Sequence, residues 1–273
     1  MTAQTSILLF TDLDGTLLGS EDYRYDAALP LLARLQAQQI PVIPVTSKTR
    51  AEVAGLRETV GLTDPFVVEN GSGIWIPQGD PRFPVAGETW GDYTLLRLGG
   101  DYATIRQGLR QLEQVLKLPL QGFGDLTVAE IQQLTGLAPQ DATQAKQRDF
   151  TEPFVTPKTL SPQTLEEAAE ALGWQVVVGD RFSHLISPQA GKGKAVQALV
   201  EIYQTPGQVF TIGLGNSPND LPMLEAVDLP IILPGTRGIH SGLAGRGWRV
   251  APCRAPEGWA RVLEEVLFER NSP

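Results

Sequence analysis

The chain has 273 residues and a formal net charge of −9, with 42% hydrophobic and 19% charged residues. This composition is typical of a folded globular protein, and the length allows one large domain or two unequal ones. The negative charge argues against nucleic acid or an anionic membrane as a partner, because both require a basic surface. A single cysteine, no signal-like leader and no apolar run of membrane-spanning length favour a cytoplasmic location.

The first seventy residues alternate short apolar runs with segments of helical periodicity, which is the pattern of a parallel sheet covered by helices. The last third resumes this pattern and is expected to complete the same sheet. We expect strands at 7–10, 41–45, 66–68, 209–212 and 229–233, and helices at 27–39, 50–60, 194–203, 221–226 and 259–269.

The middle of the chain, residues 83–186, is richer in Gly, Gln and Asp and lacks the regular alternation. Helical and strand-like pieces mix there, which predicts an α+β cap inserted into an α/β core. The core then comprises residues 1–82 and 187–273. Within the cap we expect helices at 102–117 and 127–135 and strands at 175–178 and 182–186.

Two aspartates, Asp12 and Asp14, follow the first expected strand in the segment FTDLDGTL. The carboxyl ends of strands are where open α/β sheets bind ligands. Carboxylates this close repel each other unless a cation neutralises them, so the pair predicts a hard divalent metal. Such a pair also occurs in ordinary turns, but the apolar strand and the DLDGTL context favour the metal site.

Hydroxyl groups and a lysine follow the second expected strand, at Thr46, Ser47 and Lys48. A hydroxyl just before a helix can donate a hydrogen bond to a phosphoryl oxygen, and the helix amino terminus adds a favourable field. The same residue types commonly cap helices, so this segment alone does not decide between the two roles.

Two further polar segments lie in the last third. Lys192 and Lys194 stand in a Gly-rich turn before a helix, where one ammonium can offset the carboxylates. A solvated lysine at a flexible turn is the alternative. Asn216, Asn219 and Asp220 follow a strand on a Gly-containing loop, and their oxygens suit metal coordination and the groups that orient it. A Pro-rich turn has the same composition.

Taken together, these four segments resemble the four motifs of the haloacid dehalogenase-like phosphatases, in the same order and each after a strand. The resemblance implies a Rossmann-like parallel core, and the insertion after the third strand resembles the C2-type cap of the Cof-like branch. It implies that Asp12 is the nucleophile and Asp14 the general acid and base. It also implies that Thr46 binds the phosphoryl group and that Lys192, with Lys194 as the alternative, is the motif lysine.

The cofactor that this resemblance implies is Mg²⁺. Its expected ligands are Asp12, the main-chain carbonyl of Asp14, Asn216 and, indirectly, Asp220. The family commonly has an aspartate at the position of Asn216, and the missing negative charge is expected to weaken metal binding.

Several segments are also similar to the mannosyl-3-phosphoglycerate phosphatases, which release a glycosylglycerate, a compatible solute, from a glycosyl-3-phosphoglycerate. They are TSKTR (46–50), ENG (69–71), GFGD (122–125), TGL (135–137), RDFTEPF (148–154) and GNSPND (215–220). The resemblance implies a small phosphorylated sugar-glycerate as substrate and leaves open whether the sugar is mannose or glucose. It implies substrate contacts from Ser47, Lys48, Asn70, Arg148, Glu152 and Asn219.

In the cap, Arg148 can pair with the glycerate carboxylate, and Glu152 or, as an alternative, Asp125 can accept hydrogen bonds from sugar hydroxyls. The alternative for Arg148 is a surface ion pair with Asp149 or Glu152. His184 is not assigned to catalysis.

Alternative functions are another sugar phosphatase, such as a sucrose- or trehalose-phosphate phosphatase, or a phosphomutase. A regulatory binding protein with weakened catalysis is a third, suggested by Asn216. The expected assembly is a monomer or a homodimer.

Overall fold

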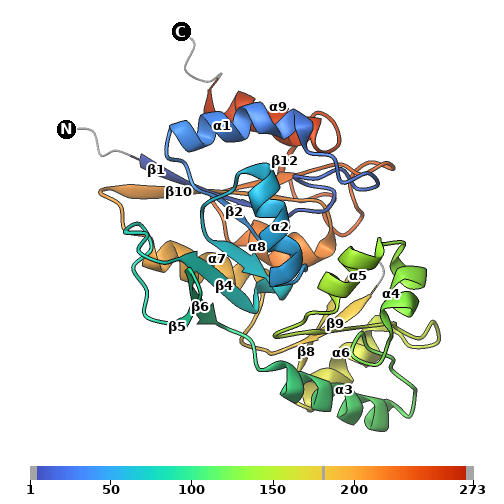
Figure 1. Ribbon diagram of the computed structural model, residues 1–273. Coiled ribbons are helices and arrows are strands. Elements are labelled where there is room, and N and C mark those ends of the chain that lie inside the picture. Colours follow the sequence, from blue (N-terminus) through green and yellow to red (C-terminus); the bar gives the residue numbers. More distant parts are fainter. Residues whose placement is uncertain (1–4, 180–181, 269–273) are drawn as a thin grey trace.

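The computed structural model describes residues 5–179 and 182–268, and it shows an α/β core with a cap beside it (Figure 1). The core contains a five-stranded, entirely parallel sheet with the order β12-β11-β10-β1-β2. Its strands are β1 (Thr5–Thr11), β2 (Val42–Pro44), β10 (Gln208–Gly215), β11 (Leu229–Ile232) and β12 (Arg249–Val250). The α/β fold class expected from the sequence is therefore confirmed.

Helices cover both faces of this sheet. Successive residues of β1 point to opposite faces, so that Leu9 joins one buried apolar cluster while Leu8 and Phe10 join the other. The first cluster receives side chains from α1 (Leu29–Ala37), α2 (Arg50–Val60) and α9 (Glu257–Leu267), and the second from α7 (Lys192–Ile202) and α8 (Leu221–Glu225). Residue 269, the expected end of the last helix, lies outside the described residues. No helix in the described ranges is long and apolar enough to cross a membrane.

A second, antiparallel sheet extends the core, with the order β3-β4-β6-β5. Its strands are β3 (Phe66–Val68), β4 (Gly73–Pro77), β5 (Glu88–Trp90) and β6 (Tyr93–Arg97). A bridge between Val45 and Val67 links it to the parallel sheet. Residues 83–98, which the sequence assigned to the cap, lie in this part of the molecule, and Phe83 and Leu95 are buried in the core clusters. We therefore propose that the cap begins near residue 101 instead of residue 83.

The cap has apolar clusters of its own, one between its sheet and two of its helices and one beside the other two helices. Its antiparallel sheet has the order β7-β9-β8. The strands are β7 (Glu152–Phe154), β8 (Gln175–Val178) and β9 (Ser183–Ile186), and the helices are α3 (Tyr102–Leu116), α4 (Val128–Thr135), α5 (Pro139–Ala145) and α6 (Pro162–Ala171). Three short 3₁₀ helices complete the described elements: η1 (Asp26–Ala28), η2 (Glu69–Gly71) and η3 (Pro218–Asp220).

Candidate active site

Three charged side chains from distant parts of the sequence meet at the carboxyl end of the parallel sheet. Asp12 follows β1, Lys192 begins α7, and Asp220 ends η3. Lys192 Nζ lies 2.7 Å from Asp12 Oδ1 and 2.6 Å from Asp220 Oδ1, and all three residues are buried. Lys194 instead donates a hydrogen bond to the main-chain oxygen of Pro188. Of the two candidate lysines, the structure places Lys192 at the aspartates.

Burial and charge together set the protonation of this cluster. Burial is the main cause that raises the pKa of Asp12 to about 7; the charge of Asp220 acts in the same direction and Lys192 acts against both. Burial alone would lower the pKa of Lys192, but the two carboxylates outweigh it and raise that pKa above its usual value. Lys192 therefore carries a positive charge, and a further cation beside Asp12 would favour the ionised carboxylate.

Asp220 faces the protein and not the cavity. Its Oδ1 accepts a hydrogen bond from Lys192, and its Oδ2 accepts from the backbone amides of Asn216 at 2.9 Å and Ser217 at 3.0 Å. Both oxygens are thus occupied, so the structure does not present Asp220 as a direct metal ligand. It holds the loop that carries Asn216.

Asp14 forms an ion pair with Lys48, a contact that no sequence motif indicates. Its Oδ2 lies 3.0 Å from Lys48 Nζ, which also lies 3.8 Å from Glu52 Oε1. Burial alone would lower the pKa of Lys48, but these two carboxylates raise it above its usual value. The ammonium of Lys48 therefore remains charged beside the proposed general acid.

The sequence left open whether the hydroxyl groups before α2 cap the helix or are free to bind a phosphoryl group, and the structure assigns the cap to Thr49 and not to Thr46. The side chain of Thr49 caps α2: its Oγ1 accepts a hydrogen bond from the amide of Glu52 at 3.2 Å, and Glu52 Oε2 accepts one from the amide of Thr49 at 2.8 Å. Thr46 is not the cap. Its buried hydroxyl oxygen accepts a hydrogen bond from the amide of Lys48 at 3.2 Å, which leaves its proton available to another acceptor.

A cavity of about 290 Å³ lies between core and cap. Its walls contain seven of the residues predicted from sequence: Asp12, Asp14, Ser47, Lys48, Arg148, Asn216 and Asn219. The other five do not line it: Thr46, Asn70, Glu152, Lys192 and Asp220. Lys192 and Asp220 lie directly behind Asp12, whereas Asn70 is buried with both amide atoms free of hydrogen bonds to the described residues.

Arg148 reaches across from the cap to the core. Its Nη1 donates to the main-chain oxygen of Ser47 at 2.8 Å, and its Nε donates to that of Ala145 at 2.9 Å. Within residues 5–179 and 182–268 it pairs with no carboxylate, so the surface ion pair weighed above is not formed; Asp149 instead lies 3.9 Å from Arg50 Nε. Arg148 therefore offers the cavity a positive charge.

Glu152 and Asp125, in contrast, do not face the cavity. Glu152 is fully buried, and its Oε1 accepts hydrogen bonds from Arg106 and from the amide of Gly124. Asp125 pairs with Arg106 and Arg110. The expectation that Glu152 contacts the sugar is therefore not supported by its position.

One wall of the cavity carries oxygen atoms that can act as ligands to a divalent cation. Asp12, Asp14 and Asn216 share this wall, and Asp14 Oδ1 is buried without a partner among the described residues. Gly15 has a φ of +76°, and a Cβ there would lie 2.4 Å from Asn216 Nδ2, so only glycine lets the amide pack here.

These oxygens fit Mg²⁺, which prefers hard ligands. Within the described chain, no three His, Cys, Asp or Glu side chains are grouped as a metal site. The groups that would hold the ion are Asp12, the main-chain oxygen of Asp14 and Asn216.

Sequence reasoning missed the role of Glu69. Its carboxylate accepts hydrogen bonds from the amides of Asp149, Phe150 and Thr151 at 2.8–3.2 Å and from the hydroxyl of Thr151 at 2.8 Å. Burial raises the pKa of Glu69, against Arg148 and these donors, which lower it. Glu69 thus ties the end of β3 to the segment that enters β7, a contact between core and cap that the turn-like sequence ENG does not reveal.

His184 and Phe123 also line the cavity. Burial, with the charges of Arg148 and Lys192, lowers the pKa of His184 to about 3, so the imidazole is neutral. Its Nδ1 has no partner among the described residues. A lone histidine on a strand gives no sequence signal for this position.

Comparisons with known proteins agree with this arrangement. Residues 9–81 match the family of haloacid dehalogenase-like hydrolases. The chain is 39% identical over 265 residues to the glucosyl-3-phosphoglycerate/mannosyl-3-phosphoglycerate phosphatase of Persephonella marina, covering 96% of this chain and 98% of the relative. It is 35% identical over 269 residues to the protein of the same name from Methanococcoides burtonii, covering 97% and 98%.

A solved structure shares the fold. The crystal structure of Thermoplasma acidophilum 0175 superposes with a TM-score of 0.69 at 15% identity, covering 96% of this chain and 98% of that one. Fold, motif order and whole-length similarity together show that the chain belongs to the haloacid dehalogenase-like hydrolases, among the phosphatases that these relatives represent.

Proposed function

We propose that the protein is a Mg²⁺-dependent phosphatase that hydrolyses a glucosyl- or mannosyl-3-phosphoglycerate to the glycosylglycerate and phosphate. One observation carries the proposal: the aspartates of the DLDG motif line the same cavity as Arg148, which pairs with no carboxylate among the described residues. A carboxylate nucleophile and a cation for the glycerate carboxylate are thus available to one small substrate. The names of the relatives that align over nearly the whole chain support the same substrate class.

In the first step, Asp12 attacks phosphorus, and the bond from phosphorus to the glycerate oxygen breaks. Asp14 enters this step protonated and gives its proton to the leaving oxygen, which becomes the glycerate hydroxyl; the Asp14 carboxylate that results is the form that pairs with Lys48. Lys192 holds the Asp12 carboxylate in place through Oδ1, at 2.7 Å. The hydroxyl of Thr46 donates to a phosphoryl oxygen.

In the second step, water attacks the phosphorus of the aspartyl-phosphate and gives a proton to Asp14. The bond between phosphorus and Asp12 breaks, which releases phosphate and restores both aspartates. Mg²⁺, when bound, neutralises the negative charge of the carboxylates and of the phosphoryl oxygens. The cap limits access of bulk water during both steps.

The test is a phosphate-release assay with purified protein on mannosyl- and glucosyl-3-phosphoglycerate, with sucrose phosphate and 3-phosphoglycerate as comparison substrates. We expect the glycosyl-phosphoglycerates to be hydrolysed fastest, and we expect EDTA to abolish the activity. Asp12→Asn should reduce turnover by at least about 1000-fold, because it removes the nucleophile. Preferential hydrolysis of sucrose phosphate, or equal activity in EDTA, would contradict the proposal.

A further inference from the structure

The cap side of the cavity differs in chemistry from the core side. It is lined by the apolar side chains of Phe123, Leu137 and Phe182. Leu137 and Phe182 are partly exposed, whereas Phe123 is 3% exposed and packs in the apolar cluster of the cap, with its ring edge to face with that of Phe182 at a centroid distance of 5.0 Å. Beside them lies the neutral His184, with Nδ1 unpartnered among the described residues and a residue exposure of 9%. A sugar ring has polar edges and an apolar face of C–H groups, and aromatic rings with a few polar atoms suit such a ligand.

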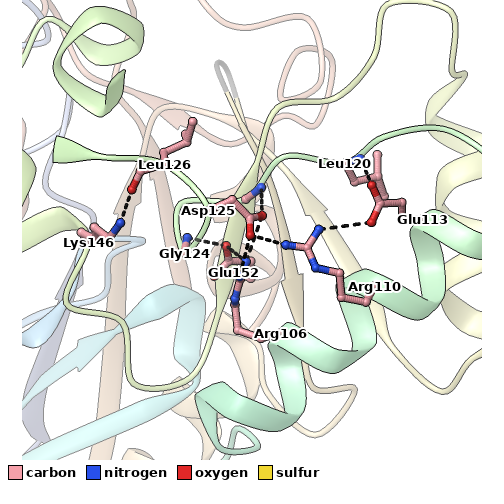
Figure 2. Close-up of polar contacts among 10 residues, drawn as sticks. Arg106, Arg110, Glu113, Leu120, Gly124, Asp125, Leu126, Lys146 and Glu152 are labelled. Atoms are coloured by element: carbon pink, nitrogen blue, oxygen red, sulfur yellow. Dashed lines mark hydrogen bonds and ion pairs between the residues drawn. The ribbon is translucent and has the colours of Figure 1, made fainter. Parts of the chain in front are cut away.

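The backbone of the loop that carries Phe123 is held on both sides of this residue. Figure 2 shows the contact of Gly124 with Glu152 on one of these sides. The amide of Gly122, on one side, donates to Asp125 Oδ2 at 3.1 Å. The amide of Gly124, on the other side, donates to Glu152 Oε1 at 2.8 Å. The two flanking amides are therefore each fixed by a carboxylate.

Arg106 of α3 joins these two carboxylates. Its Nη2 lies 2.6 Å from Asp125 Oδ1 and its Nη1 lies 3.1 Å from Asp125 Oδ2, a two-point contact with one acid. The same Nη1 lies 3.1 Å from Oε1 of the fully buried Glu152. Figure 2 shows the side chain of Arg106 directed toward both acids. A planar group with fixed donors can set this geometry in a way that a lysine cannot.

The glycines of the GFGD segment make this close packing possible. A Cβ at Gly122 would lie 2.0 Å from Glu152 Oε1, and a Cβ at Gly124 would lie 2.5 Å from Arg106 Cζ. Any side chain at either position would push the carboxylate or the guanidinium away from the loop. Glycine at 122 and at 124 therefore allows the carboxylate and the guanidinium to pack directly against the loop that carries Phe123.

We infer that Arg106 is a positioning residue that, through Asp125 and Glu152, fixes the loop of Phe123 and with it the apolar wall of Leu137 and Phe182, against which the sugar ring of the substrate packs. The inference rests on the proposed function. It gives the two cap acids a role in holding the loop instead of binding sugar hydroxyls. It assigns recognition of the sugar to an apolar face, and recognition of the phosphoglycerate part to the core and Arg148.

The experiment compares kcat/KM for glycosyl-3-phosphoglycerate with kcat/KM for two sugar-free substrates, 3-phosphoglycerate and acetyl phosphate. The variants are Arg106→Gln, Phe123→Ala and the double variant. Arg246→Gln is the matched control, because it removes an arginine–carboxylate pair with Glu225 on the core surface. Gly124→Ala displaces Arg106 while leaving its charge intact, and it provides a second route to the same change.

We expect Arg106→Gln and Gly124→Ala to lower kcat/KM for the glycosyl substrate by about tenfold or more, mainly through KM, and for the sugar-free substrates by less than about threefold. The double variant should resemble Phe123→Ala, because both changes remove the same contact. Equal losses on all substrates, or additive losses in the double variant, would overturn the inference while leaving the proposed function intact. If the unaltered protein hydrolyses no glycosyl-3-phosphoglycerate, the proposed function fails and the inference fails with it.

Discussion

The charge of Lys192 offsets the charges of two buried carboxylates. Lys194, two residues later, is exposed and is therefore the matched control. Lys192→Met leaves Asp12 and Asp220 buried without their cation, so we expect the free energy of unfolding to fall by about 3 kcal/mol and turnover to fall by at least about 100-fold. Urea unfolding and phosphate release measure these effects. Lys194→Met should change unfolding by less than about 0.5 kcal/mol. Similar effects of the two changes would contradict the charge balance described here.

Asn216 offers a neutral amide oxygen to the proposed metal site, where a carboxylate would bind a divalent cation more tightly. Asn216→Asp adds a carboxylate beside Asp12 and Asp14, so we expect the Mg²⁺ concentration for half-maximal activity to fall by about threefold to tenfold. A titration of activity with Mg²⁺ measures this value. Asn219→Asp, on the same loop, separates ligation from a general increase in negative charge. An unchanged or higher Mg²⁺ requirement in Asn216→Asp would argue against Asn216 as a ligand.

The sequence predicts where most of these side chains lie, but not where each one points. Asp12, Lys192 and Asp220 meet because each stands at the carboxyl end of the sheet or at the start of a neighbouring helix, and this follows from strand order. The orientation of Asp220 depends on amides four and three residues before it. The burial of Glu152 depends on Arg106, a partner 46 residues away. Contacts of this kind leave no local sequence pattern.

Among the elements, η2 makes a contact between core and cap through one carboxylate. Glu69→Gln replaces an acceptor oxygen by an NH₂ group that faces amide donors, so we expect the free energy of unfolding to fall by about 2 kcal/mol. Glu58→Gln, on the exposed surface of α2, should change it by less than about 0.5 kcal/mol. Urea unfolding at neutral pH compares the two variants. Equal stability of both would mean that the hydrogen bonds to residues 149–151 contribute little.

Elements with strong end signals are predicted well from sequence. The helix expected at 50–60 coincides with α2, whose first turn contains the capping box of Thr49 and Glu52 and whose last residue is followed by Gly61, with a φ of +79°. Helix α5 was not predicted, because its sequence PQDATQA has no apolar period and only its alanines are buried. Strand β5 is exposed at every residue and exists through its pairing with β6. Tertiary contacts, not local preference, define these two elements.

The free energy of unfolding of the whole molecule should depend on pH through the protonation of His184. The folded-state pKa is lowered from 6.5 to about 3, so between these values the unfolded chain binds a proton that the folded chain does not. Stability conferred by the neutral imidazole is therefore present above pH 6.5 and is lost as the pH falls. Between pH 7 and pH 5 this loss is about 2 kcal/mol.

Urea unfolding of the unaltered protein and of His184→Gln at pH 7 and pH 5 isolates this effect, because other titrating groups contribute to both. We expect the variant to lose about 2 kcal/mol less than the unaltered protein over this interval. His240→Gln, at an exposed position, should follow the unaltered protein. Parallel pH profiles for all three proteins would show that His184 is already neutral in the unfolded chain or accessible to protons in the folded one.

The central position of β1 in the parallel sheet has a consequence for biosynthesis. β1 lies between β10 and β2, and Thr5 pairs with Gln208. A nascent chain leaving the ribosome therefore carries this apolar strand with one edge unpaired until most of the polypeptide has been translated. The cap, with apolar clusters of its own, lies wholly between β1 and β10 in the sequence. The loop that carries Asp12 is thus assembled late, and chaperones that shield apolar strands have a long opportunity to act on β1.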